Sequence, residues 1–108
     1  MQMLSEVVKK GYLNKQSRYL KKWRRRYVVL YTDRLETFEN ETKEGNPTEV
    51  IFLNQCSSIQ SANDVSTSYC LMIVCQGTEF LFQCESQKQK EDWIAVLSRF
   101  ISQTHTWR

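Results

Sequence analysis

The sequence has little of what linkers and membrane spans require. It contains three glycines and one proline among 108 residues, which leaves no room for a Pro/Gly-rich linker or a low-complexity segment. No apolar run approaches the ~20 residues that a membrane-spanning helix needs. The segment Met1–Lys10 also lacks the apolar stretch of a signal peptide. Any contact with a membrane is therefore expected to be peripheral.

Residues that bind metals or catalyse reactions are also scarce. The single histidine, His105, lies in a polar stretch, and the four cysteines form no C-x-x-C pair, so a zinc site has no usable ligand spacing. No Gly-rich phosphate loop, carboxylate dyad or Cys–His pair indicates an enzyme. We expect no metal, no cofactor and no catalysis. The cysteines are expected to be buried thiols in the reducing cytosol, with a disulfide as the alternative: Cys56, Cys70, Cys75 and Cys84.

Basic residues are concentrated in one segment. Residues 7–32 contain nine of the 15 Lys and Arg residues and none of the 12 Asp and Glu residues. The rest of the chain therefore contains six basic and 12 acidic residues, although the formal net charge of the whole chain is only +3. Such polarised charge steers partners toward one face. The sequence favours a partner that carries several negative charges.

Period-2 alternation of side chains predicts short β-strands over the first eighty-odd residues. The polar stretches 40–47 and 61–68 are expected to be loops, and Gln76-Gly77 is a plausible hairpin turn. Strands are expected around Gly11 and at 23–31, 35–40, 50–53, 56–62, 69–75 and 78–84.

The pattern then changes to that of a helix. Ser86 and Gln89 form a capping-box pattern at its start. Apolar residues follow at i, i+3, i+4 and i+7, which makes a single apolar stripe. The helix is expected at about 87–102, with its stripe laid on the strands: Trp93, Val96, Leu97 and Phe100.

This order of elements resembles a pleckstrin homology (PH) domain. The resemblance implies a mainly β fold, a split barrel of about seven antiparallel strands in two nearly orthogonal sheets, capped by one C-terminal α-helix. We expect this domain at 7–103, with flexible termini at 1–6 and 104–108. The resemblance is carried by KKGYLNK (Lys9–Lys15), WRRRYVVL (Trp23–Leu30), FLFQCES (Phe80–Ser86) and EDWIAVL (Glu91–Leu97).

Lipid-binding members of that family share a basic signature, which this sequence matches. Lys15 is followed by eight residues, then by Arg24-x-Arg26 and the hydrophobic pair Val28-Val29. The resemblance implies a phosphoinositide pocket at the open end of the barrel. The first hairpin is also similar to that of protein kinase B, and that similarity makes Asn54 either a pocket contact or a turn residue.

The alternation of the strands supports the same three cations. Lys15 shares a face with Leu13, and Arg24 and Arg26 share a face with Val28. If the two strands pair as a hairpin, the three positive groups converge on one point, where an anion would relieve their repulsion. A carboxylate that already occupies that meeting point would end the case for a lipid ligand. The alternative is that the cations are solvated surface charges.

The loop between these strands adds further candidates. Arg18 and Lys22 are expected to contribute to phosphoinositide binding. The remaining residues suit a membrane interface, where apolar groups insert and Lys meets anionic head groups: Tyr19, Leu20 and Lys21. Alternatively, the Tyr and Leu side chains fold back onto Trp23. Arg25 points to the opposite face and is expected to be a flanking charge.

These features predict a cytoplasmic, peripheral membrane signalling module, a monomer, that binds phosphoinositides and recruits a larger protein to anionic membranes. The alternative is a protein-interaction module of the same fold with weak or no specific lipid binding. The third-strand segment Leu35–Phe38, which lacks a tyrosine, favours that alternative, as do three acids in the next loop: Glu39, Glu41 and Glu44. No nucleic-acid partner is expected, because the pI of about 8.7 is below the usual basic threshold.

Overall fold

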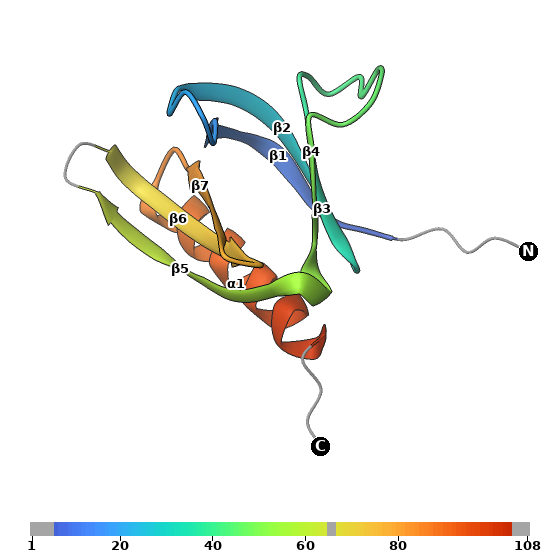
Figure 1. The fold of residues 1–108 in the computed structure, drawn as a ribbon, viewed down its shortest axis with the longest axis vertical. Helices are drawn as coiled ribbons and strands as arrows, with labels where there is room; N and C mark the ends of the chain where they lie inside the picture. Colours follow the sequence, from blue (N-terminus) through green and yellow to red (C-terminus); the bar gives the residue numbers. More distant parts are fainter. Residues whose placement is uncertain (1–5, 65–66, 105–108) are drawn as a thin grey trace, which may run out of the picture.

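The computed structural model describes residues 6–64 and 67–104 (Figure 1). The flexible termini were expected at 1–6 and 104–108; of these, residues 1–5 and 105–108, which include His105, lie outside the described residues. No helix among the described residues is long and apolar enough to cross a membrane. The elements are β1 (Val7–Gln16), β2 (Trp23–Tyr31), β3 (Arg34–Phe38), β4 (Glu49–Phe52), the short 3-10 helix η1 (Leu53–Gln55), β5 (Cys56–Asp64), β6 (Thr67–Cys75), β7 (Thr78–Gln83) and α1 (Gln87–Thr104).

The seven strands are all antiparallel and follow the hydrogen-bonded order β4-β3-β2-β1-β7-β6-β5. β1 joins the two halves, but it pairs with β7 through only Asn14–Gln83 and Lys15–Phe82. The sheet therefore bends at β1 into two layers, and α1 lies at the end away from the β1–β2 loop (Figure 1). The predicted mainly β fold with a C-terminal helix is confirmed, with one continuous sheet in place of two separate ones.

Some boundaries differ from the sequence prediction. The stretch 61–68, expected to be a loop, is largely strand, because β5 and β6 stay paired out to Asp64–Thr67. β5 is an edge strand, so its polar residues do not need to enter the core. Their polar composition is typical of a loop, and for that reason the sequence did not predict a strand here. The helix also continues beyond the expected end at 102, to Thr104.

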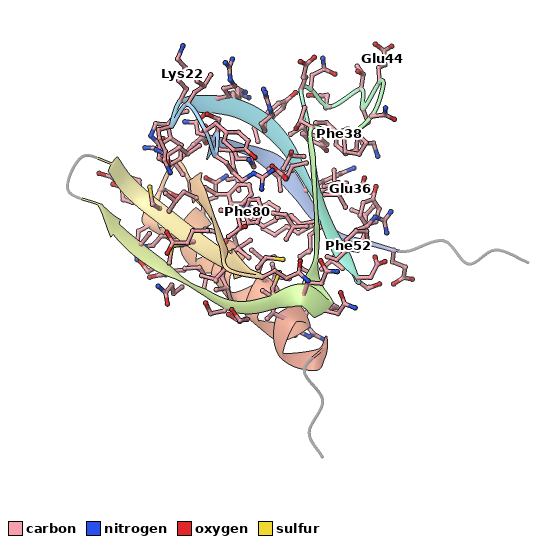
Figure 2. The ribbon with its side chains drawn as sticks, in the orientation of Figure 1. Lys22, Glu36, Phe38, Glu44, Phe52 and Phe80 are labelled. Carbon is pink, nitrogen blue, oxygen red and sulfur yellow. The ribbon has the colours of Figure 1, made fainter. Side chains whose placement is uncertain are left out.

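The core lies between the two layers and under the helix. Inward-facing residues of alternate strand positions meet the apolar stripe of α1, where Trp93 and Leu97 are each only 1% exposed. Figure 2 shows Phe80 pointing into the space between the layers. Half of the predicted capping box is present, since the Gln89 backbone amide donates to Ser86 Oγ at 3.1 Å. The Gln89 side chain accepts from the backbone amide of Glu85, one residue before Ser86, at 2.6 Å.

The four cysteines are free thiols, and all are buried. Cys56 and Cys75 are register partners, and both sulfurs lie near the Phe52 carbonyl oxygen, at 3.4 and 3.9 Å. Burial, with a smaller contribution from Cys75, raises the pKa of Cys56 to about 12, and burial raises the pKa of Cys84 to about 11.

These pKa shifts predict that stability falls in alkali. Between the ordinary thiol value near 9 and the raised pKa values, the unfolded chain loses protons that the folded chain keeps. The free energy of unfolding should then drop by up to ~1.4 kcal/mol per pH unit for each thiol. Urea unfolding at pH 8, 9 and 10 measures this slope. The double variant C56A/C84A should flatten it, and an unchanged slope in that variant would contradict the assignment.

Candidate functional site

The candidate site lies at the open end of the bent sheet, away from α1. Two loops rim this end, the β1–β2 loop at 17–22 and the β3–β4 loop at 39–48. Figure 2 shows Lys22 and Glu44 marking the tips of these loops. The rim therefore combines a basic loop with an acidic one.

A cavity of about 210 Å³ lies between the two loops. Four of its lining residues are cations that the sequence nominated: Lys15, Arg18, Arg24 and Arg26. The other lining residues are Ser17, Tyr19, Thr48 and Glu49. Four positive groups and one negative group give the lining a formal net charge of +3, which favours a multiply charged anion.

The register of the first hairpin brings the cations together. Lys15 lies directly across from Arg24, and Leu13 lies across from Arg26. Because side chains alternate along each strand, Lys15 and both arginines emerge on the face whose other members fill the core. Arg24 is exposed, and Arg26 is partly buried and donates to the Arg25 carbonyl oxygen at 3.2 Å.

Lys15 has an acidic partner inside the cavity. Its Nζ lies 3.1 Å from Glu49 Oε1, and the two side chains are only 9% and 20% exposed. The Lys15 ammonium also lies 5.6 Å from the centre of the Phe80 ring, at the edge of the core. The lysine is therefore paired with a carboxylate. The acid that the sequence analysis set against a lipid ligand is thus present at Lys15, whereas Arg24 and Arg26 have no ion-pair partner among the described residues.

The backbone next to Glu49 is firmly held. The Thr48 amide donates to the Thr37 carbonyl oxygen at 2.7 Å, and the two threonine hydroxyls are 2.6 Å apart. Thr37 is fully buried and is the register partner of Glu49. These contacts determine where the Glu49 side chain leaves the strand.

Lys15, Arg24 and Arg26 were predicted to converge, but Glu49 was missed. The sequence directs attention to the acids of the following loop, yet Glu39, Glu41 and Glu44 do not line the cavity. One signal for Glu49 was available. Ile51 is an obvious core residue of β4, and Glu49 two positions earlier shares its face.

The β1–β2 loop is closed by backbone hydrogen bonds. The Ser17 amide donates to the Lys22 carbonyl oxygen at 2.8 Å, and the Lys21 amide donates to the Ser17 carbonyl oxygen at 3.2 Å. Tyr19 and Leu20 project from this turn, 85% and 66% exposed. The alternative in which these two side chains fold back onto Trp23 is therefore wrong.

The remaining nominated residues lie around the cavity rather than in it. Lys21 lines a second hollow of about 430 Å³, which shares Arg18 and Tyr19 with the first. Lys22 is exposed and lines neither hollow. Arg25 points to the opposite face, as predicted, and stacks 4.0 Å from the centre of the Tyr12 ring. Asn54 is exposed in η1 and does not line the cavity.

Comparison with known proteins identifies the family. The family model described as the PH domain matches residues 7–102. The chain belongs to the PH domain family. Members of this family are generally non-catalytic binding modules, and they often bind phosphoinositides or inositol phosphates.

Two curated relatives illustrate the range of proteins that carry a similar PH domain. Pleckstrin homology domain-containing protein 1 of Arabidopsis thaliana is 32% identical over 104 residues, which cover 92% of this chain and 72% of that protein. The human dual adapter for phosphotyrosine and 3-phosphotyrosine and 3-phosphoinositide is 26% identical, over 88% of this chain but only 34% of the adapter. The chain thus spans about a third of the length of that second relative.

A solved structure supports the fold. The crystal structure of the C-terminal PH domain of pleckstrin, in complex with an inositol pentakisphosphate, superposes with a TM-score of 0.80. It is 20% identical and covers 92% of this chain and 99% of the pleckstrin domain. At this identity, the likeness establishes that the two chains share a fold.

Proposed function

We propose that this PH domain binds phosphoinositide head groups in the cavity at its open end and so recruits a larger protein to anionic membranes from the cytoplasm. The observation that carries the proposal is the gathering of four cations around one cavity of about 210 Å³. The proposal is further supported by the family and by the relative whose name includes 3-phosphoinositide.

The chemistry of the cavity suits adjacent ring phosphates. Arginine offers a planar fork of donors to phosphate oxygens, whereas lysine acts as a mobile point charge. Each charge-assisted hydrogen bond contributes about 1.5–3 kcal/mol. Three such contacts, from Arg18, Arg24 and Arg26, would support micromolar affinity, about 8 kcal/mol, at the upper end of that range.

The β1–β2 loop is proposed to touch the membrane while the cavity holds the head group. Tyr19 and Leu20 would enter the interface, and Lys21 and Lys22 would meet anionic head groups at about 1 kcal/mol each. Lys22 would act at the membrane surface, since its side chain does not line the cavity.

Because the loop is proposed to touch the membrane and the cavity to hold the head group, a change in the loop should affect vesicle binding and soluble-ligand binding differently. The variant L20S should weaken binding to phosphoinositide vesicles about tenfold, because it removes from the interface an apolar side chain that does not line the cavity. Calorimetry with a soluble inositol trisphosphate should show unchanged affinity. The matched control F52S changes an apolar residue that is exposed on β4 and should leave both affinities unchanged. Equal losses for vesicles and soluble ligand would contradict a membrane role for the loop.

A head-group panel tests the proposed function itself. Calorimetry with inositol phosphates, and sedimentation with vesicles that differ only in their phosphoinositide, should give saturable binding at near-physiological salt. The amide resonances of Lys15, Arg24 and Arg26 should shift during the titration. No binding to any member of the panel would overturn the proposal.

One observation favours a second candidate, a protein-interaction module with weak or no specific lipid binding. The Glu49 carboxylate repels anions within the cavity and forms an ion pair with Lys15. If vesicles and inositol phosphates both failed to bind while an acidic protein surface shifted the same resonances, the basic face would serve a protein partner.

A further inference from the structure

We propose that Glu49 is a built-in competitor for the ligand phosphate, so that an incoming head group must exchange places with this carboxylate at Lys15. This inference rests on the proposed function, because it concerns the affinity of the same cavity. It assigns a positioning role to a residue that lies outside the basic signature.

The ion pair between Glu49 and Lys15 is well placed to compete. The carboxylate lies 3.1 Å from the ammonium, and the two side chains are 20% and 9% exposed. A partly buried pair is screened much less than a surface pair. A phosphate that approaches Lys15 therefore meets an ammonium that is already neutralised at close range.

The other cations of the cavity are not neutralised in this way. Among the residues that the structure describes, Arg18 and Arg24 have no ion-pair partner. A first phosphate can therefore bind on the arginine side without displacing Glu49. Contact with Lys15 requires a second step, in which phosphate replaces the carboxylate.

Glu49 is positioned by the fold rather than by chance. Thr48 and Thr37 lock the start of β4 through backbone and hydroxyl hydrogen bonds. On the other side, the buried Lys15 side chain lies against Phe80 and has little freedom to turn away. The ion pair is thus a feature of the unliganded state that any ligand of Lys15 has to break.

Exchange at Lys15 is favourable only for a strong anion. A phosphate group carries more charge than a carboxylate and has three acceptor oxygens, so it can replace Glu49. The displaced carboxylate is then left near the ligand and repels it. Glu49 therefore lowers the affinity of the cavity, and it reduces the contribution that Lys15 makes to binding.

The test is a double-mutant cycle with inositol 1,4,5-trisphosphate, measured by calorimetry at fixed salt. The variant E49Q should bind about tenfold tighter than wild type, since no partly buried ion pair has to be broken. K15M should weaken wild type about threefold but E49Q about thirtyfold, so that the two residues are coupled. The control E44Q makes the same charge change in an exposed loop residue outside the cavity and should shift affinity less than twofold.

Thermal stability is a second readout, and E49Q should lower it while raising the affinity. Without ligand, E49Q replaces the carboxylate beside the buried ammonium of Lys15 with a neutral amide, so its melting temperature should fall by about 4 °C. Tighter binding by a less stable protein is the combined result expected of a competitor. If E49Q does not fold, the carboxyl carbon resonance of Glu49 in the wild-type protein provides the test, because it should shift on saturation with the trisphosphate.

The outcomes separate the two proposals. If neither wild type nor E49Q binds the trisphosphate, the proposed function fails. If wild type binds and E49Q binds no tighter, only the competitor role of Glu49 is overturned. An equal gain from E44Q, an equal gain from E49Q in the K15M background, or a carboxyl resonance that stays fixed at saturation would also overturn that role.

Discussion

The double variant R24E/R26E is expected to lose binding to phosphoinositide vesicles and to soluble inositol phosphates. Both arginines line the cavity, and neither belongs to the buried core. Loss of two charge-assisted contacts removes about 3 kcal/mol of binding free energy, even at the low end of the range for each contact. This corresponds to a loss of affinity of more than about a hundredfold. The new negative charges would further repel phosphate.

The matched control changes net charge equally at other positions. Lys10 and Arg99 are exposed and do not line the cavity, so K10E/R99E makes the same charge change away from the site. This control should weaken vesicle binding only slightly, and more at low salt than at high salt, because exposed distant charges are screened. Equal losses for the two double variants would show that general charge, and not the cavity, attracts the ligand. Circular dichroism should confirm that both variants keep the fold.

The convergence of Lys15 with Arg24 and Arg26 could be predicted because a strand has a strict period of two. Once Leu13 and Val28 were assigned to the core, the side of each neighbouring charged residue followed from its position. The hairpin register then placed Lys15 directly across from Arg24. Local pattern was sufficient here, because the two strands are adjacent in sequence and pair with each other.

Contacts between distant segments were harder to predict. The partner of Lys15 is Glu49, which comes from a strand that pairs with neither β1 nor β2. Its arrival in the cavity depends on the course of the long loop at 39–48, which no local pattern determines. The ends of β5 and β6 were missed for a similar reason. Their pairing out to Asp64–Thr67 continues through polar residues whose composition is typical of loops.

The substitution W93A is expected to produce the largest loss of stability. Trp93 is 1% exposed in α1 and belongs to the core cluster formed with the strands. Replacing a buried Trp with Ala removes about 3–5 kcal/mol from the free energy of unfolding. A small domain has only about 5–15 kcal/mol in total. Urea unfolding followed by circular dichroism measures the loss, and F100A, which truncates a half-buried aromatic residue of the same helix, should lose clearly less.

The same variant also distinguishes stability from function. Trp93 lies on α1, and its ring centre is 5.2 Å from the ammonium of Lys9 near the start of β1, whereas the cavity lies at the other end of that strand. At a temperature where W93A remains folded, its affinity for a soluble inositol phosphate should match wild type, because every cavity-lining residue is unchanged. Loss of affinity in the folded variant would mean that the helix end and the cavity are energetically coupled. Retained affinity, together with the loss in R24E/R26E, would show that one end of the barrel stabilises the fold while the other binds the anion.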